Sequence, residues 1–226
     1  MNLETIHIDL EDITLSGKLH RPEQPRGLVI VTARKDCRLL QIENEWLFKC
    51  LSRKNIAVLF TFLLDPPENQ DLDIPFDIGL MSKHIELLTE WVSHQESLRR
   101  LPLGYFAVNT AAAAVLEASI PAGRKVRAIV CSCGRPDLAG PKLSFVRPAT
   151  LLITGSENVY LTELNWQAYE LLNCEKQLVT IEGDPRQFEE EHKARQIAHL
   201  SSGWFDRHFP VAHTAGTAET IKHHDT

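Results

Sequence analysis

The spacing of hydrophobic residues changes along the chain, and each spacing predicts one kind of element. Near the start, Ile6, Ile8 and Leu10 alternate with polar residues, and the alternation resumes at Ile13 and Leu15 after an acidic pair. A period of two is typical of strands that bury one face. The opening segment therefore predicts a pair of antiparallel strands.

Further along, continuous apolar runs predict strands that are buried on both faces, as in a parallel sheet. Between these runs, apolar residues recur every three to four positions, which is typical of helices that pack one face on a sheet. The predicted strands are Gly27–Thr32, Ile56–Leu64, Leu103–Val108, Val126–Cys131, Thr150–Thr154 and Lys176–Ile181. The predicted helices are Leu39–Leu51, Ile78–Val92, Thr110–Ser119, Leu161–Leu172 and Phe188–Phe209.

This alternation of strands and helices predicts an α/β fold with a mostly parallel, twisted sheet and helices on both faces. No repeat or linker divides the chain, so we expect one domain over residues 1–210. Residues 211–226 are small, polar and rich in His, which favours a disordered tail. The tryptophans fall at helical spacings that predict core packing: Trp46, Trp91, Trp166 and Trp204.

The amino-acid composition excludes several classes of protein. The 226 residues carry a formal net charge of −6, and 43% are hydrophobic and 24% charged. These proportions are ordinary for a folded chain and exclude a disordered, collagen-like or disulfide-rich protein. An acidic chain lacks the basic surface that general nucleic-acid binding needs, so we expect no nucleic-acid partner.

Three further features bear on location. The five cysteines are an odd number, which favours reduced thiols and a cytoplasmic protein. The longest apolar stretch, around Ile56–Leu64, is far shorter than the roughly 20 residues of a membrane-spanning helix. The first residues lack the basic start and apolar core of a signal peptide. We therefore expect a soluble, cytoplasmic protein without membrane association.

The segment Gly104–Ala114 (GYFAVNTAAAA) predicts a sharp turn between a strand and a helix, with Asn109 at the turn. α/β-Hydrolases carry their nucleophile on such a turn, in the form G-x-S-x-G. The segment closely resembles small dienelactone-hydrolase-like proteins of that superfamily, in which the stretch is GYFGASTGAAAA. Further matching blocks are Leu28–Val31, Phe76–Ile78, Gly134–Gly140, Leu151–Gly155, Leu161–Asn165 and Phe188–Glu190. The resemblance runs from Ile6 to Phe209 and implies an α/β-hydrolase fold with about eight strands, and hydrolysis of ester or lactone bonds.

The catalytic residues of that family do not carry over. Asn109 stands at the serine position, Asn158 at the acid position and Arg186 at the histidine position. An amide is not a nucleophile at neutral pH, and arginine is always protonated and cannot act as a base. The resemblance thus implies a degenerate triad with no catalytic residues, and it favours a pseudoenzyme with a binding, regulatory or scaffold role.

The former active-site pocket could instead bind an anion or an acidic protein partner. Asn is among the few residues that tolerate the left-handed region, so Asn109 can preserve the turn without the nucleophile. A helix beginning near Thr110 would direct backbone N–H groups toward an anion. The alternative is that the basic residues near this pocket, Arg34, Lys35, Arg38 and Arg186, form ion pairs on a solvated rim. Their partners would be Asp36, Asp65, Glu157 and Asp184. The candidate ligand-binding residues are Ala33, Arg34, Lys35, Arg38, Asn109, Thr110 and Arg186.

Two other functions stay open. The first is an esterase or other hydrolase that uses a non-standard set of residues, drawn from Asp36, Cys37, Asp65 and His192. The second is a purely structural subunit whose pocket is filled by its own side chains.

No motif indicates a metal or a cofactor. His192 and His199 lie on one predicted helix without the H-E-x-x-H spacing, and Cys131 and Cys133 lack a second cysteine pair. We interpret the histidines as part of a solvated helix face and the cysteines as thiols without function. In the segment GRPDLAG, Arg135 and Asp137 predict an ion pair that holds a strand end.

Overall fold

The computed structural model describes residues 3–10, 13–33, 39–63, 77–183 and 191–210. The strands are β1 (Glu4–Asp9), β2 (Thr14–His20), β3 (Gly27–Ala33), β4 (Ile56–Phe62), β5 (Leu103–Val108), β6 (Val126–Ser132), β7 (Ala149–Gly155) and β8 (Lys176–Ile181). The helices are α1 (Leu39–Ser52), α2 (Ile78–His94), α3 (Ala111–Ala122), α4 (Val159–Leu171) and α5 (Glu191–His208). Two 3-10 segments are η1 (Gly123–Lys125) and η2 (Pro136–Phe145).

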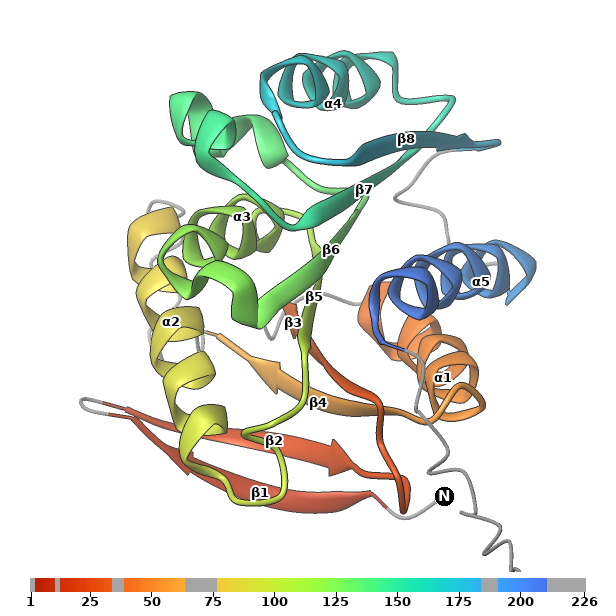
Figure 1. Cartoon of the computed structure of the whole chain (residues 1–226). Coiled ribbons are helices and arrows are strands. Elements are labelled where there is room, and N and C mark those ends of the chain that lie inside the picture. Colours follow the sequence, from red (N-terminus) through yellow and green to blue (C-terminus); the bar gives the residue numbers. More distant parts are fainter. Residues whose placement is uncertain (1–2, 11–12, 34–38, 64–76, 184–190, 211–226) are drawn as a thin grey trace, which may run out of the picture.

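The strands form one eight-stranded sheet in the order β1-β2-β4-β3-β5-β6-β7-β8. β1 and β2 pair antiparallel, β2 also pairs antiparallel with β4, and the strands from β4 to β8 run parallel. α2, α3 and α4 cover one face, and α1 and α5 cover the other (Figure 1). The predicted α/β class, the initial antiparallel pair and the helices on both faces are confirmed.

The two faces explain why the central strands are mainly apolar. Along β3, Leu28 and Ile30 point into the core under α2 and α3, whereas Val29 and Val31 point into the core under α1 and α5. Successive side chains of a strand point to opposite faces. In a strand covered by helices on both sides, side chains of both orientations are therefore buried and mainly apolar.

α3 packs closely on the central strands because its first turn is made of alanines. All four residues from Ala111 to Ala114 are buried. The Cys131 thiol on β6 donates to the Ala112 carbonyl, with sulfur and oxygen 3.8 Å apart. Small side chains are therefore what allow this helix to approach the sheet.

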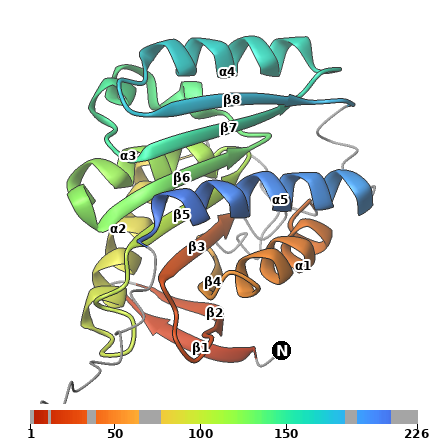
Figure 2. The same ribbon diagram turned by 45° about the vertical axis from the view of Figure 1, so that its right-hand side comes forward.

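α5 approaches the opposite face equally closely, over two glycines. A Cβ atom at Gly104 would lie 2.6 Å from Phe205 Cε1, and one at Gly27 would lie 2.3 Å from Phe209 Cδ2. Real Cβ atoms do not approach other atoms so closely, so the two aromatic rings occupy space that only glycine leaves free. Figure 2 shows α5 lying across this face of the sheet.

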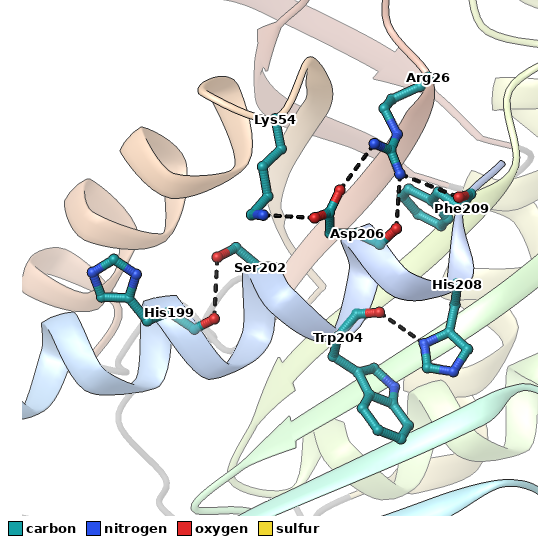
Figure 3. Close-up of polar contacts among 8 residues, drawn as sticks. All are labelled: Arg26, Lys54, His199, Ser202, Trp204, Asp206, His208 and Phe209. Carbon is teal, nitrogen blue, oxygen red and sulfur yellow. Dashed lines mark hydrogen bonds and ion pairs between the residues drawn. The ribbon is translucent and has the colours of Figure 1, made fainter. Parts of the chain in front are cut away.

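The end of α5 is also tied by polar contacts (Figure 3). The Arg26 guanidinium contacts the Asp206 carboxylate at 2.9 Å and donates to the Asp206 and Phe209 carbonyls at 2.7 and 3.2 Å. Lys54, just after α1, contacts the same carboxylate at 2.7 Å. The Trp204 indole donates to the Ala149 carbonyl at 3.1 Å. Three separate segments thus hold the C-terminal turn of α5.

Two features of the fold differ from the sequence prediction. Trp166 was expected in the core, but its side chain is 47% exposed on the outer side of α4; Trp204 is buried. The 3-10 segment η2 was not predicted, because its Gly and two Pro residues break every helical pattern.

Several predictions fall on residues that the structure does not describe. They concern the last residue of the predicted strand Ile56–Leu64, the start of the last helix at 188–190 and the tail at 211–226. The domain limits of 1–210 and 211–226 stay predictions. Among the helices that are described, none is long and apolar enough to cross a bilayer.

The packing of α5 yields a stability prediction. Gly104→Ala should lower the free energy of unfolding by about 1–3 kcal/mol, because the added methyl group overpacks against Phe205. Gly203→Ala is the control. Gly203 lies on α5, the helix that carries Phe205, and has open space around its Cβ position. This change should stabilise the protein by about 1 kcal/mol through helix propensity. Denaturant unfolding of both variants measures the difference, and equal effects would contradict the close approach.

Candidate functional site

The turn from β5 into α3 is the centre of the candidate site. Asn109 follows Val108, the last residue of β5, and has a φ of 52°, in the left-handed region. Thr110 then enters the helical region with a φ of −70°. The predicted sharp turn and the left-handed conformation of Asn109 are both confirmed. Its side chain is exposed, so the amide faces outward from the end of the central strand.

The turn is held from the side of β6. The Asn109 carbonyl accepts from the N–H groups of Ala112 at 3.3 Å and Arg135 at 2.9 Å. A Cβ atom at Gly134 would lie 2.4 Å from the Ala112 Cβ and 3.1 Å from the Asn109 carbonyl oxygen. Gly134 is therefore the residue that allows the chain leaving β6 to pass against the turn.

Asn165 supports this arrangement from α4. It is fully buried, and its amide donates to the Gly134 carbonyl at 3.0 Å and to the Leu161 carbonyl at 2.9 Å. Sequence reasoning did not assign a role to Gly134 or Asn165. The available signal was their position in two of the blocks that match the family, but neither residue type indicates this contact by itself.

Thr110 leaves an unused donor at the start of α3. Its carbonyl accepts from the Ala113 N–H at 3.2 Å, but its side chain makes no capping bond. In the described part of the chain, its buried hydroxyl has no hydrogen-bond partner. The first N–H groups of a helix lack partners within the helix and carry partial positive charge, so this end of α3 favours an anion.

Asn158 serves as the N-cap of α4. Its side-chain oxygen accepts from the Leu161 N–H at 2.9 Å. Asn and Asp are equally good at this task, so an amide here keeps the cap while lacking a negative charge. Asn109 and Asn158 both lie at the carboxyl edge of the sheet, after β5 and β7, with β6 between these strands.

Most of the predicted basic residues lie outside the described residues. These are Arg34, Lys35, Arg38 and Arg186. Ala33 ends β3, and its side chain is also not described. Since the carboxyl ends of parallel strands share one edge, the segments that follow β3 and β8 leave the sheet at the same edge as Asn109. The alternative catalytic candidates Asp36, Cys37 and Asp65 and the predicted ion-pair partner Asp184 fall outside as well.

The predicted ion pair after β6 is confirmed. Arg135 donates to Asp137 through Nε at 2.9 Å and Nη2 at 2.8 Å. This hydrogen bonding raises the pKa of Arg135 further, so its guanidinium stays charged. The geometry fits the structural role that the sequence indicated.

The cysteines and histidines near this edge are poor candidates for chemistry. Cys131 is fully buried, and burial raises the pKa of its thiol, which keeps it in the unreactive protonated form. His192 and His199 are exposed on α5. Within the described ranges, no group of three His, Cys, Asp or Glu residues is placed to hold a metal ion.

No family model matches the chain. The chain is 34% identical over 205 residues to a putative phosphoribosyl transferase of Mycobacterium tuberculosis, in the strains CDC 1551 and H37Rv. The match covers 91% of this chain and 46% of the relatives, so the chain spans about half the length of the curated relatives it matches.

Solved structures agree with the fold. A dienelactone hydrolase from Anabaena variabilis has a TM-score of 0.86 and 29% identity, covering 92% of this chain and 99% of that chain. An esterase domain from a Rhodothermus marinus protein has a TM-score of 0.71 and 14% identity, with the same two coverages, and shows the fold alone. From the sheet order, the turn at Asn109 and these similarities, the chain belongs to the α/β-hydrolase superfamily, with a dienelactone-hydrolase-like fold.

Proposed function

We propose that this chain is a catalytically degenerate α/β-hydrolase protein that binds an anionic ligand where its superfamily carries the active site. The observation that carries the proposal is the turn at Asn109. It keeps the left-handed geometry of a nucleophile turn and the helix that begins directly behind it, while an amide stands where hydrolysis needs a hydroxyl.

The three family positions argue against ester hydrolysis by the family's route. The amide of Asn109 has no nucleophilic oxygen at neutral pH, and a base is missing because arginine stays protonated at position 186. The third position, Asn158, uses its oxygen to cap α4 and bears no charge that could stabilise an imidazolium. In triad enzymes, loss of these groups costs about a millionfold in turnover.

Several features support anion binding at the same edge. α3 is twelve residues long and begins directly after the turn, so its partial positive charge is concentrated there. The Thr110 hydroxyl is a donor without a partner in the described structure. The sequence adds Arg34, Lys35, Arg38 and Arg186 in the segments that follow β3 and β8, and such residues would supply full charges.

The ligand class that we propose is a phosphate monoester. A helix start combined with a hydroxyl and guanidinium groups suits the several oxygens of a phosphate better than a single carboxylate. The mycobacterial relatives bear the name of a phosphoribosyl transferase, which makes a 5-phosphoribosyl compound the first choice of probe. We do not extend the transferase reaction to this chain, since it matches less than half of those proteins.

Binding tests this proposal directly. Ribose 5-phosphate should raise the melting temperature and give a saturable calorimetric signal, whereas ribose should do neither. Arg186→Ala and Thr110→Val should each weaken the affinity about tenfold, the effect of losing a hydrogen bond to a charged group. Arg124→Ala is the matched control, because Arg124 is exposed just beyond the C-terminal end of α3. Equal affinity for ribose, or variants that bind like the original protein, would contradict an anion site.

Hydrolysis gives a second, independent test. On short-chain aryl esters and lactones, the unchanged protein should be no faster than its Asn109→Ala variant. The variant Asn109→Ser, Asn158→Asp, Arg186→His should exceed both, since Asp retains the α4 cap and Ser at the left-handed position costs only about 1 kcal/mol. Circular dichroism confirms that each variant folds. Turnover by the unchanged protein clearly above Asn109→Ala would favour the alternative, a hydrolase with a non-standard set of residues.

A further inference from the structure

Arg135 lies at the same edge of the sheet as the two asparagines. It follows β6, which runs between β5 and β7, and these two strands precede Asn109 and Asn158. The Arg135 N–H donates to the Asn109 carbonyl at 2.9 Å, so the backbone of this arginine contacts the turn directly. An arginine side chain thus starts beside the turn that carries the proposed function.

The backbone of Arg135 is held from more than one side. Pro136 follows it, and the Arg135 carbonyl accepts from the Leu138 N–H at 3.3 Å where η2 begins. Before it, the Gly134 carbonyl accepts from the buried Asn165 amide at 3.0 Å. The Asn109 turn, η2 and α4 therefore all fix the point from which the side chain extends.

Asp137 holds the guanidinium but engages only one of its edges. Nε donates to Oδ1 at 2.9 Å and Nη2 donates to Oδ2 at 2.8 Å. The guanidinium is planar and carries further N–H groups on Nη1 and Nη2. Among the described residues, Nη1 has no hydrogen-bond partner. The end of the group formed by Nη1 and Nη2 therefore retains donors that the protein does not use.

The guanidinium is partly open to solvent. The Arg135 side chain is 34% exposed, whereas the Asp137 side chain behind it is only 13% exposed. The hydrogen bonds to Asp137 raise the pKa of Arg135, and Tyr160 in the first turn of α4 adds to this shift through its charge. The group thus lies between η2 and the first turn of α4, at the edge that carries the Asn109 turn.

A guanidinium held in this way suits a phosphate group. Nη1 and Nη2 can donate side by side to two oxygens of one phosphate. The Asp137 carboxylate lies on the Nε side and leaves this end of the group unobstructed. Because Asp137 already fixes the plane of the guanidinium, less side-chain freedom is lost when a ligand binds.

We propose that Arg135 binds the phosphate group of the ligand at the Asn109 turn, with Nη1 and Nη2 donating to two phosphate oxygens while Asp137 holds the opposite edge. The proposal rests on the proposed function and adds the residue that selects the phosphate. Recognition then depends on the fork of the guanidinium and not on positive charge alone.

Calorimetric titration with ribose 5-phosphate tests this role. Arg135→Ala should weaken the affinity at least about tenfold, the effect of losing hydrogen bonds to a charged group. Arg135→Lys should weaken it nearly as much, because an ammonium keeps the charge but cannot form the fork. Lys142→Ala is the matched control and should bind like the unchanged protein. It removes one positive charge and the other ion pair of η2, in which Lys142 contacts Glu117 at 2.6 Å.

The pH dependence of binding separates a ligand contact from a structural role. The second pKa of a phosphate monoester is about 6, so the ligand gains negative charge between about pH 5 and about pH 7.5. The unchanged protein should bind more tightly at the higher pH, and both Arg135 variants should show a smaller preference. A variant that had only loosened the end of β6 would lose affinity by the same factor at both pH values, which would overturn the contact.

The outcomes distinguish this inference from the proposed function. If ribose 5-phosphate binds the unchanged protein and Arg186→Ala weakens it, but both Arg135 variants bind normally, the role of Arg135 is overturned and the proposed function stands. If ribose 5-phosphate does not bind the unchanged protein, the proposed function fails and this inference fails with it. Melting curves establish that each variant folds, and Arg135→Lys carries the test if Arg135→Ala does not.

Discussion

The left-handed turn at Asn109 is the constraint on which the centre of the molecule depends. It reverses the chain within two residues and places α3 directly over the strands from which it emerged. The reversal is possible because Gly134 leaves room beside the turn and because the first residues of α3 are alanines. A larger side chain at any of these positions would lift the helix from the sheet and separate the turn from the exit of β6.

The two asparagines at this edge each perform a structural task of the backbone. Asn109 accepts the left-handed conformation, and Asn158 caps α4. Both tasks need a short polar side chain and neither needs a hydroxyl or a charge. The shape of this edge therefore depends on backbone tasks that an amide can perform, which is compatible with the binding role that we propose.

Much of the fold could be predicted from the chain alone, because buried parallel strands produce unmistakable apolar runs. The limits of Leu103–Val108 and Lys176–Ile181 agree with the structure residue for residue. Asn109 was identifiable through its family context. Trp166 was assigned to the core because helical spacing reports a shared face without saying whether that face is covered. Asn165 was missed because its contact with Gly134 joins residues 31 positions apart.

The close approach of α5 to β3 and β5 also constrains how the sequence can change. The rings of Phe205 and Phe209 lie where a side chain at Gly104 or Gly27 would be. Each glycine and the ring that packs on it therefore depend on each other. A relative with alanine at position 104 should carry a smaller residue at position 205, and the same holds for positions 27 and 209. Substitutions at these sites are therefore expected to arise in pairs, and a protein in which only one partner has changed should show α5 displaced outward from the sheet.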